Sequence, residues 1–282
     1  MRKLLFACFI VIPNIIFAQS FHLGLFGGVS NYQGDLVQGA YNSRFTNPAI
    51  GVTGSYEVMD RLMIRGGFTF SKVEGDDKYN KKDYLKLRNL SFESKISEFS
   101  VVGEYSIFNI YNIRWTPYVF GGVAVYHFDP YAMDSTGNKV YLKPLSTEGQ
   151  GLSGYPESKP YSLTQVALPF GGGVKYAIND NFRIGLEVGV RKLFTDYLDD
   201  VSTNYADAAD LLAERGQLAV DYAYRGDEVP GGDPIYPQKG AQRGGSNQMD
   251  WYYFTGLHLT YRIGGGFGGG NKKGYGCPKV LP

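Results

Sequence analysis

The sequence predicts an all-β protein, an eight-stranded antiparallel transmembrane up-and-down β-barrel with long extracellular loops and short periplasmic turns. Three observations predict this fold. Apolar and polar residues alternate with a period of two over eight stretches. The 282 residues include 38 Gly, 23 Tyr and 18 Phe, which favours strands and tight turns over helices. The connections between the stretches alternate between long and short, as they do in bacterial outer-membrane barrels.

The first 18 residues are predicted to be a secretory signal peptide. Arg2 and Lys3 precede an apolar stretch at residues 4–17, and cleavage is expected after Ala18. Cys8 lies within this segment, and the apolar run before it is too short for lipoprotein processing. Cys277 would then be the one cysteine of the mature chain.

Eight strands are expected in the barrel region, residues 19–263. Residues 182–191 alternate most plainly, with Arg183 and Glu187 opposite an apolar face. Residues 115–128 carry Val, Gly and aromatic residues on both faces, so their register stays open. Residues 251–263 have aromatic residues near both ends of the apolar face, as a membrane-crossing strand requires. The predicted strands span residues 21–32, 50–58, 62–71, 98–107, 115–128, 163–178, 182–191 and 251–263.

The connections set the orientation of the barrel. A secreted N-terminus starts the first strand in the periplasm, so the long connections fall on the extracellular side. The longest, residues 193–250, is expected to contain a short helix at residues 206–220, begun near Ser202 or Thr203, with Leu211, Leu212 and Leu218 on one face. The other long connections are residues 33–47, 74–89 and 129–160, and the short ones lie near residues 59–60, 109–114 and 179–181.

Charged residues oppose the apolar face of several strands, which favours a barrel over a soluble β-sandwich. Side chains fill the interior of an eight-stranded barrel. These residues are therefore expected to form a paired, partly hydrated plug in the lumen, with no continuous pore. The predicted network comprises Glu57, Arg65, Glu98, Glu104, Lys175, Arg183, Glu187, Arg191 and Arg262.

The histidines provide no recognisable metal motif. His22, His127 and His258 lack the spacing of metal ligands, although His22 and His258 could approach each other where the first and last strands meet. No Ser or Cys beside a His on a predicted strand suggests an activated nucleophile. We therefore expect no enzymatic activity, metal or cofactor. The net charge of +1 gives no basic surface for nucleic acid.

Two further features carry expectations of their own. Asp196, Asp199 and Asp200 lack the ligand spacing of a calcium loop and are interpreted as a solvated or capping cluster. Residues 264–282 are predicted to form a Gly-rich periplasmic tail, whose GGGFGGG run lacks the ending of a phosphate-binding loop. The tail is either a disordered end or a spacer that carries a contact site. Cys277 is correspondingly either inert or available for intermolecular pairing.

Three segments carry a resemblance to a known family. FRIGLEVGVRKLFTDYLDDVSTNY at residues 182–205, LLAERGQLA from Leu211 and the GYGCPKVLP ending resemble the PorG-type outer-membrane barrels of Bacteroidetes. The RKLFTDYLDDVS portion is the most specific. The resemblance implies a structural component of the type IX protein secretion system, which anchors a periplasmic ring of a lipoprotein and its partner to the outer membrane.

The resemblance also implies a contact site. Tyr275, Cys277 and Pro278 are the candidate periplasmic contacts, and a disulfide between Cys277 and a ring component is a further hypothesis. The alternative function is an integrity or adhesin-like barrel that binds extracellular ligands through its long loops. A third class, a membrane hydrolase, lacks a nucleophile and base in the sequence.

Overall fold

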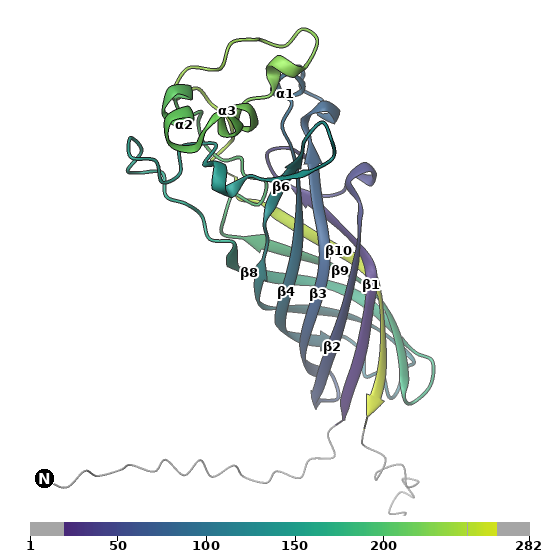
Figure 1. Ribbon diagram of the computed structural model, residues 1–282. Coiled ribbons are helices and arrows are strands. Elements are labelled where there is room, and N and C mark those ends of the chain that lie inside the picture. The colour runs from purple at the N-terminus through teal and green to yellow at the C-terminus, as the bar shows by residue number, and fades with distance from the viewer. Residues whose placement is uncertain (1–19, 247, 264–282) are drawn as a thin grey trace, which may run out of the picture.

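The barrel wall is built from eight antiparallel strands that close on themselves. The computed structural model describes residues 20–246 and 248–263. Its strands form one sheet, and pairing of β3 with β4 closes eight of them into a ring (Figure 1). The predicted eight-stranded barrel is confirmed. The wall strands are β1 (Phe21–Gln33), β2 (Asn47–Met59), β3 (Leu62–Asp76), β4 (Ser91–Ser106), β5 (Trp115–His127), β8 (Thr164–Ala177), β9 (Phe182–Leu193) and β10 (Trp251–Ile263).

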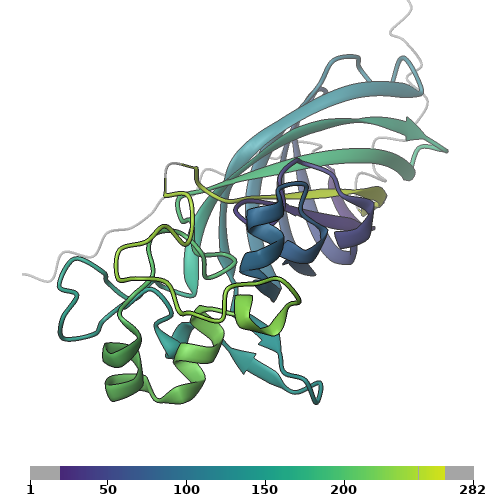
Figure 2. The ribbon, with the colours of Figure 1, turned by 90° about the horizontal axis from the view of Figure 1, so that it is seen from above.

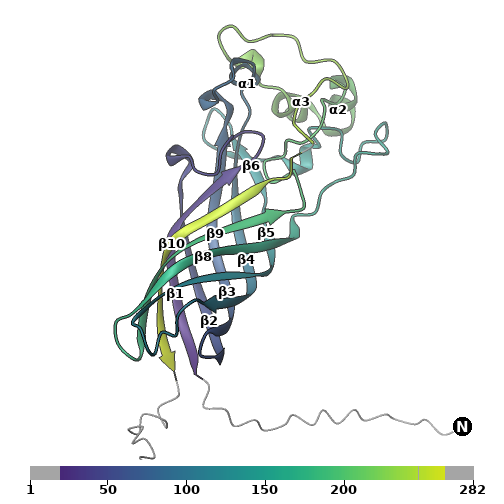
Figure 3. The ribbon, with the colours of Figure 1, turned by 180° about the vertical axis from the view of Figure 1, so that it is seen from behind.

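The first and last strands meet along their full length. Phe21 pairs with Ile263 at one end and Gln33 pairs with Trp251 at the other. β10 therefore lies between β1 and β9, as Figure 3 shows. Closure leaves no free edge in the wall, so each strand has a hydrogen-bonding neighbour on both sides.

The two ends of the barrel differ. At the turn end, short connections join β2 to β3, β4 to β5 and β8 to β9, and here β1 begins and β10 ends (Figure 1). At the opposite end, the described parts of residues 34–46, 77–90, 128–163 and 194–250 fold together into what we call the cap. This confirms the predicted alternation of short and long connections.

The outer face of the wall is apolar. Leu25, Ile50 and Leu186 are 61%, 64% and 56% exposed, respectively, on three different strands. Among the residues that the structure describes, no helix combines the length and the hydropathy needed to cross a membrane. An apolar surface of this extent around a protein is unfavourable in water and suits contact with lipid.

Aromatic side chains ring the turn end of the outer face. They come from the turn-end portions of seven strands, and each is between 40% and 48% exposed. Such girdles lie at the level of the lipid headgroups in membrane barrels, where an apolar ring with a polar edge is stable. The ring comprises Phe21, Tyr56, Tyr105, Trp115, Tyr176, Phe182 and Tyr261.

The register of β5, which the sequence left open, is settled by the packing of its aromatic residues. Tyr118 and Phe120 are buried in the lumen, whereas Val119 faces outward and is 53% exposed. Glycines on the facing strand make room for these rings. A Cβ on Gly171 would lie 2.8 Å from the Phe120 ring, and one on Gly173 would lie 2.9 Å from the Tyr118 ring. Aromatic rings therefore occupy both faces of β5, which explains its ambiguous sequence pattern.

Strands β3 and β4 extend further toward the cap than predicted. β3 includes residues 74–76 and β4 begins at Ser91, both within or next to the segment expected to be a charged loop. Lys72 Nζ lies 2.8 Å from Glu74 Oε2 and 2.9 Å from Glu93 Oε2. These ion pairs stabilise the ends of β3 and β4 that extend toward the cap. The outer face of these ends carries charged residues, so the alternation of apolar and polar residues stops before the two strands end.

The cap contains short elements of its own. Strands β6 (Pro130–Met133) and β7 (Lys139–Tyr141) form a hairpin that pairs with β4, within a segment predicted to be a loop. Seen from above, the cap elements gather into one group (Figure 2). The helical elements are η1 (Ser43–Phe45), η2 (Asp77–Tyr79), α1 (Asp83–Arg88), η3 (Lys143–Leu145), α2 (Ala208–Arg215), α3 (Gln217–Ala223) and η4 (Gly226–Glu228).

The single helix predicted at residues 206–220 is in fact two helices, α2 and α3. Gly216 separates them with a φ of +87°, a left-handed conformation that glycine adopts readily. The N-cap residue of α2 is Asp207, whose side chain accepts a hydrogen bond from Ala209 N. Of the three leucines predicted to share one helix face, Leu211 is fully buried, whereas Leu212 and Leu218 are about half exposed.

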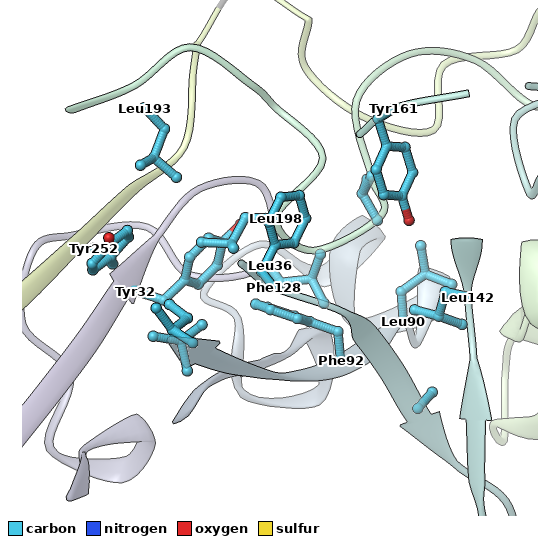
Figure 4. Packing of buried hydrophobic residues seen from close by; sticks show 14 of the residues in the cluster. Tyr32, Leu36, Leu90, Phe92, Phe128, Leu142, Tyr161, Leu193, Leu198 and Tyr252 are labelled. Atoms are coloured by element: carbon cyan, nitrogen blue, oxygen red, sulfur yellow. The ribbon is translucent and has the colours of Figure 1, made fainter. Parts of the chain in front are cut away.

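A hydrophobic core holds the cap to the barrel. Leu36, Phe92, Phe128 and Leu198 come from four separate parts of the chain and are at most 2% exposed (Figure 4). Burial of each such side chain contributes about 1.5–3 kcal/mol. The long connections therefore form a folded unit continuous with the barrel interior.

Candidate functional site

Four acidic and four basic side chains meet inside the barrel, and all are less than one-tenth exposed. The ninth residue of the predicted network, Arg262, is half-buried at the turn end. In chain order the eight are Glu57, Arg65, Glu98, Glu104, Lys175, Arg183, Glu187 and Arg191.

The centre of the lumen holds one connected ionic cluster. Arg65 Nη1 lies 2.6 Å from Glu187 Oε2 and 3.4 Å from Glu104 Oε2, and Lys175 pairs with the same Glu104. The Tyr118 hydroxyl donates to Glu187 Oε2 over 2.7 Å. A hollow of about 30 Å³ beside Arg65 and Glu187 has room for roughly two waters.

A second pair lies nearer the cap. Arg191 binds both oxygens of Glu98, with Nε at 2.9 Å from Oε2 and Nη2 at 3.1 Å from Oε1. The Tyr252 hydroxyl donates to Glu98 Oε2 over 2.6 Å, and the Arg191 guanidinium lies 4.3 Å from the Phe254 ring centroid. Bidentate pairing of this kind fixes the geometry of both side chains.

At the turn end, the connection between β4 and β5 folds across the barrel mouth. The Tyr111 hydroxyl lies 2.8 and 2.7 Å from the two oxygens of Glu57 and accepts a hydrogen bond from Arg183 over 3.0 Å. The Arg183 and Arg262 guanidinium carbons lie 5.4 and 5.6 Å from the Tyr111 ring centroid. Tyr111 therefore covers the lumen from this side, a role that the sequence did not indicate.

A Ser and a His that the predicted strands did not bring together lie side by side. Ser20 Oγ is 3.1 Å from His22 Nε2, on the same face and two residues apart, just where the predicted strand began. The geometry is not that of a catalytic triad, because Glu57 also contacts Nε2 and Ser20 donates directly to Glu57 over 2.7 Å. The arrangement links charges at the barrel mouth.

The other histidines occupy separate places. His258 lies in the middle of the lumen, 2.7 Å from Thr53 Oγ1 and 3.3 Å from Arg65 Nη1. In the pairing of β1 with β10, His258 lies opposite Phe26 and not opposite His22. Both are buried in the lumen without meeting, and His127 is exposed at the cap end of β5.

A group of carboxyls lies buried at the base of the cap. Asp196, Asp199, Asp200 and Asp250, which we call the acid cluster, are at most 5% exposed. The solvated alternative for residues 196, 199 and 200 is therefore wrong, whereas the capping alternative describes Asp199, whose Oδ1 accepts a hydrogen bond from Val201 N over 2.9 Å. Thr147 and Tyr161 from one long connection and Leu198 from another contact these carboxyls, and this long-range packing leaves no trace in the local sequence.

Asp199 and Asp250 share one hydroxyl. The Tyr32 hydroxyl lies 2.5 Å from Asp199 Oδ2 and 3.1 Å from Asp250 Oδ1, and its single proton can serve only one of them at a time. Burial, followed by the charge of neighbouring aspartates, raises the pKa of both carboxyls well above the usual range. This pair retains a proton under conditions in which an exposed Asp is ionised.

Asp196 and Asp200 differ in their partners. Burial raises the pKa of Asp196 to about 8, and neither of its carboxyl oxygens has a hydrogen-bond partner among the residues that the structure describes. Burial raises the pKa of Asp200 to about 6, against the charge of Arg243 and hydrogen bonds from Thr147 and Tyr161 that lower it. Within residues 20–246 and 248–263, no three His, Cys, Asp or Glu side chains are placed to hold a metal ion.

One arginine links the acid cluster to the rest of the cap. Arg243 Nη1 donates to Glu148 Oε1 over 3.0 Å and to the Asp200 carbonyl over 2.6 Å, and its Nε donates to the Ala223 carbonyl. Glu148 also accepts from the backbone of Ser202. No sequence pattern pointed to Arg243, because it lies in a segment rich in Gly and polar residues.

The predicted contact residues Tyr275, Cys277 and Pro278 lie outside the described residues, as do the expected signal peptide and the rest of the tail.

Comparison with known proteins identifies a family. The profile of a family described as "Domain of unknown function (DUF6089)" matches residues 2–146, just over half of the chain. The chain belongs to the DUF6089 family. The match extends through β1 to β7 and so covers five of the eight wall strands and part of the cap. None of the curated proteins matches this DUF6089 chain.

Solved structures with a similar fold are all distant in sequence. Neisserial surface protein A is 9% identical, with 86% of this chain and 97% of that chain covered and a TM-score of 0.42. Ail of Yersinia pestis, in complex with sucrose octasulfate, is 9% identical over 88% and 100%, with a TM-score of 0.42. OprG of Pseudomonas aeruginosa is 12% identical over 86% and 95%, with a TM-score of 0.40. The fold assignment for the DUF6089 chain rests on its own strand pairing.

Proposed function

We propose that this chain is a non-enzymatic outer-membrane component of the type IX protein secretion system, which anchors a periplasmic ring to the membrane. The turn end would face the periplasm and the cap the cell exterior, with lipid around the apolar wall. The observation that carries the proposal is that Phe21 pairs with Ile263 at the turn end, so β1 begins and β10 ends on the side that is proposed to face the periplasm.

The filled lumen supports an anchoring role. Paired charges and aromatic rings occupy the centre, and Tyr111 covers the turn end. A barrel of eight strands has an interior just wide enough for side chains to fill. The RKLFTDYLDDVS segment, the most specific part of the resemblance, contributes Arg191 to the lumen and Asp196, Asp199 and Asp200 to the base of the cap. In this proposal, these buried residues hold the barrel and the base of the cap in a fixed conformation, which anchors the tail.

The test is a deletion of residues 264–282 in the native host. We expect normal barrel assembly, measured by heat-modifiable migration in gels, together with loss of type IX cargo from the medium. A variant that keeps residues 264–270 and scrambles residues 271–282 controls for tail length. Normal cargo secretion by the deletion strain would contradict the proposal.

The tail cysteine allows a second test of the same proposal. If Cys277 forms a disulfide with a ring component, native membranes run without reductant should give a shifted band that is absent from the Cys277→Ser variant. An unchanged mobility of the wild-type chain would rule out the disulfide, although a non-covalent contact through Tyr275 and Pro278 would still be tested by the deletion.

A second candidate function is binding of an extracellular ligand by the cap. The observation that favours it is that the four long connections share one hydrophobic core, and three of them line a hollow of about 550 Å³. If secretion is intact in the deletion strain, this function becomes the leading one.

A further inference from the structure

The hollow in the cap lies between three of the long connections. Its volume of about 550 Å³ falls in the range of small-ligand sites, roughly 300–1,000 Å³. The lining combines tyrosines, glutamines and charged residues with two leucines and two glycines.

The buried charges on this lining already have protein partners. Arg88 donates to both oxygens of Asp77, over 2.6 and 2.9 Å, and Arg243 pairs with Glu148 over 3.0 Å. Asp35 Oδ2 accepts from Gly245 N over 2.8 Å. These groups hold the walls of the pocket in place. They leave little unpaired charge for an anionic ligand, which would otherwise seek a free arginine.

The groups that remain available are neutral or balanced. Gln38 and Gln248 are exposed, and their side-chain amides make no hydrogen bond with any residue that the structure describes. Lys82 and Asp233 bring opposite charges. A side-chain amide offers both a donor and an acceptor, which matches the hydroxyl groups of a neutral ligand.

Aromatic rings supply the apolar part of the lining. Tyr84 is 65% exposed, and the Tyr205 and Tyr224 rings meet edge to face with centroids 6.0 Å apart. The negative face of an aromatic ring attracts the positively polarised C–H groups of a sugar ring. The lining is too polar for a lipid chain, and α1 and loop segments border it in place of a free strand edge, which an extended peptide would need.

We propose that this pocket binds a neutral oligosaccharide, with Tyr84 stacking on a sugar ring and Gln38 and Gln248 bonding to its hydroxyls. The proposal rests on the second candidate function and is independent of the secretion role. Because the interaction involves no net charge, its affinity changes little with ionic strength.

The experiment uses the mature full-length chain in lipid nanodiscs. Binding of maltotetraose, cellotetraose, chitotetraose and mannotetraose is measured by calorimetry at two salt concentrations, with a sulfated heparin tetrasaccharide as the anionic probe. We expect at least one neutral tetrasaccharide to bind. Tyr84→Ala should weaken that binding about tenfold, and the Gln38→Ala, Gln248→Ala double variant should weaken it by a similar factor.

Matched variants outside the pocket serve as controls. Tyr41 is 69% exposed and Gln217 is exposed on α3, and neither lines the hollow. Tyr41→Ala and Gln217→Ala should bind as the wild type does. The proposal is overturned if no neutral tetrasaccharide binds, if only the sulfated probe binds in a salt-dependent manner, or if the controls weaken binding equally.

The same variants separate this inference from the secretion proposal. Tyr84→Ala should leave cargo secretion unchanged, because its side chain lies in the cap. The tail deletion should leave sugar binding unchanged. Loss of sugar binding in the tail deletion would contradict the assignment of the ligand to this pocket.

Discussion

The lumen and the base of the cap bury similar numbers of carboxyl groups, but the partners of these groups differ. In the lumen, Glu98, Glu104 and Glu187 each contact an Arg or Lys side chain. In the acid cluster, Asp199 and Asp250 contact one tyrosine hydroxyl, and among the described residues neither forms an ion pair. Buried charge is tolerated either by pairing or by protonation. The lumen therefore resists changes of pH, whereas the cap responds to them.

The largest expected effect comes from breaking a lumen pair. Arg65→Leu leaves Glu187 without its partner at 2.6 Å and weakens the pairing of Glu104, so we expect the free energy of unfolding to fall by about 3–5 kcal/mol. Urea unfolding of the barrel in phospholipid vesicles, followed by the fluorescence of Trp115 and Trp251, measures it.

The control removes both charges of the lumen pair. The Arg65→Leu, Glu187→Leu double variant leaves no unpaired carboxylate at this position, and it should recover most of the lost stability. If Arg65→Leu lowers the free energy of unfolding by less than about 1 kcal/mol, water must solvate Glu187. The lumen and the cap would then not differ in how they stabilise buried carboxyl groups.

An intermediate effect is expected from Arg243 at the base of the cap. Arg243→Leu leaves Glu148 with its hydrogen bonds from Ser202 and Thr203, so we expect a smaller loss of about 1–3 kcal/mol, confined to the cap. Hydrogen exchange should rise across residues 194–246 while the barrel strands keep their protection. Arg215→Leu, at an exposed position on α2, is the matched control and should change little. Equal loss of protection in the strands would show that cap and barrel unfold together.

The mildest change is expected from pH. The folded pKa of Asp200 is about 6 and that of Asp196 about 8, both above the usual value of 3.8. Between 3.8 and these values the folded cap binds more protons than the unfolded chain, so its stability is greatest at acid pH and falls as the pH rises to about 8. Protease resistance of the cap at pH 5 and pH 8 measures the difference.

Asp196→Asn tests which carboxyl causes this pH dependence. The substitution removes a charge whose oxygens have no described hydrogen-bond partner, so resistance at pH 8 should rise and the slope above pH 6 should flatten. Asp221→Asn, at an exposed position, should keep the wild-type slope. A cap that is more resistant at pH 8 than at pH 5 would reverse the sign and refute the argument.

The wall could be predicted because lipid imposes a strict rule on it. Outward residues must be apolar at every second position, so Phe182, Leu186 and their counterparts define the strands, and Arg183 and Glu187 fall inward by default. The rule fails at β5, where Tyr118 and Phe120 fill the lumen with rings as apolar as those facing the lipid. It also ends where β3 and β4 leave the apolar belt.

The cap could not be predicted because its burial depends on contacts between distant segments. Asp199 and Asp250 are over fifty positions apart and meet at Tyr32, near the end of the first strand. Asp200 looks like a solvent-exposed loop residue until Thr147 and Tyr161 cover it from another connection. The local pattern of apolar and polar residues carries no information about contacts between residues that are distant in the sequence. The helix in the longest connection was predicted from its local spacing, and the break between α2 and α3 at Gly216 could also have been recognised locally.

The pairing of β1 with β10 also governs when this protein can assemble. The sheet acquires its last two rows of hydrogen bonds only after Trp251–Ile263 has been delivered, so every earlier intermediate exposes two unsatisfied strand edges. Contacts between the two ends of a chain are slow to form, because the entropy of closing the loop must be overcome first. Closure of the wall is therefore a late step. An assembly factor that binds the free edge of β1 before closure would be displaced when β10 pairs with that edge.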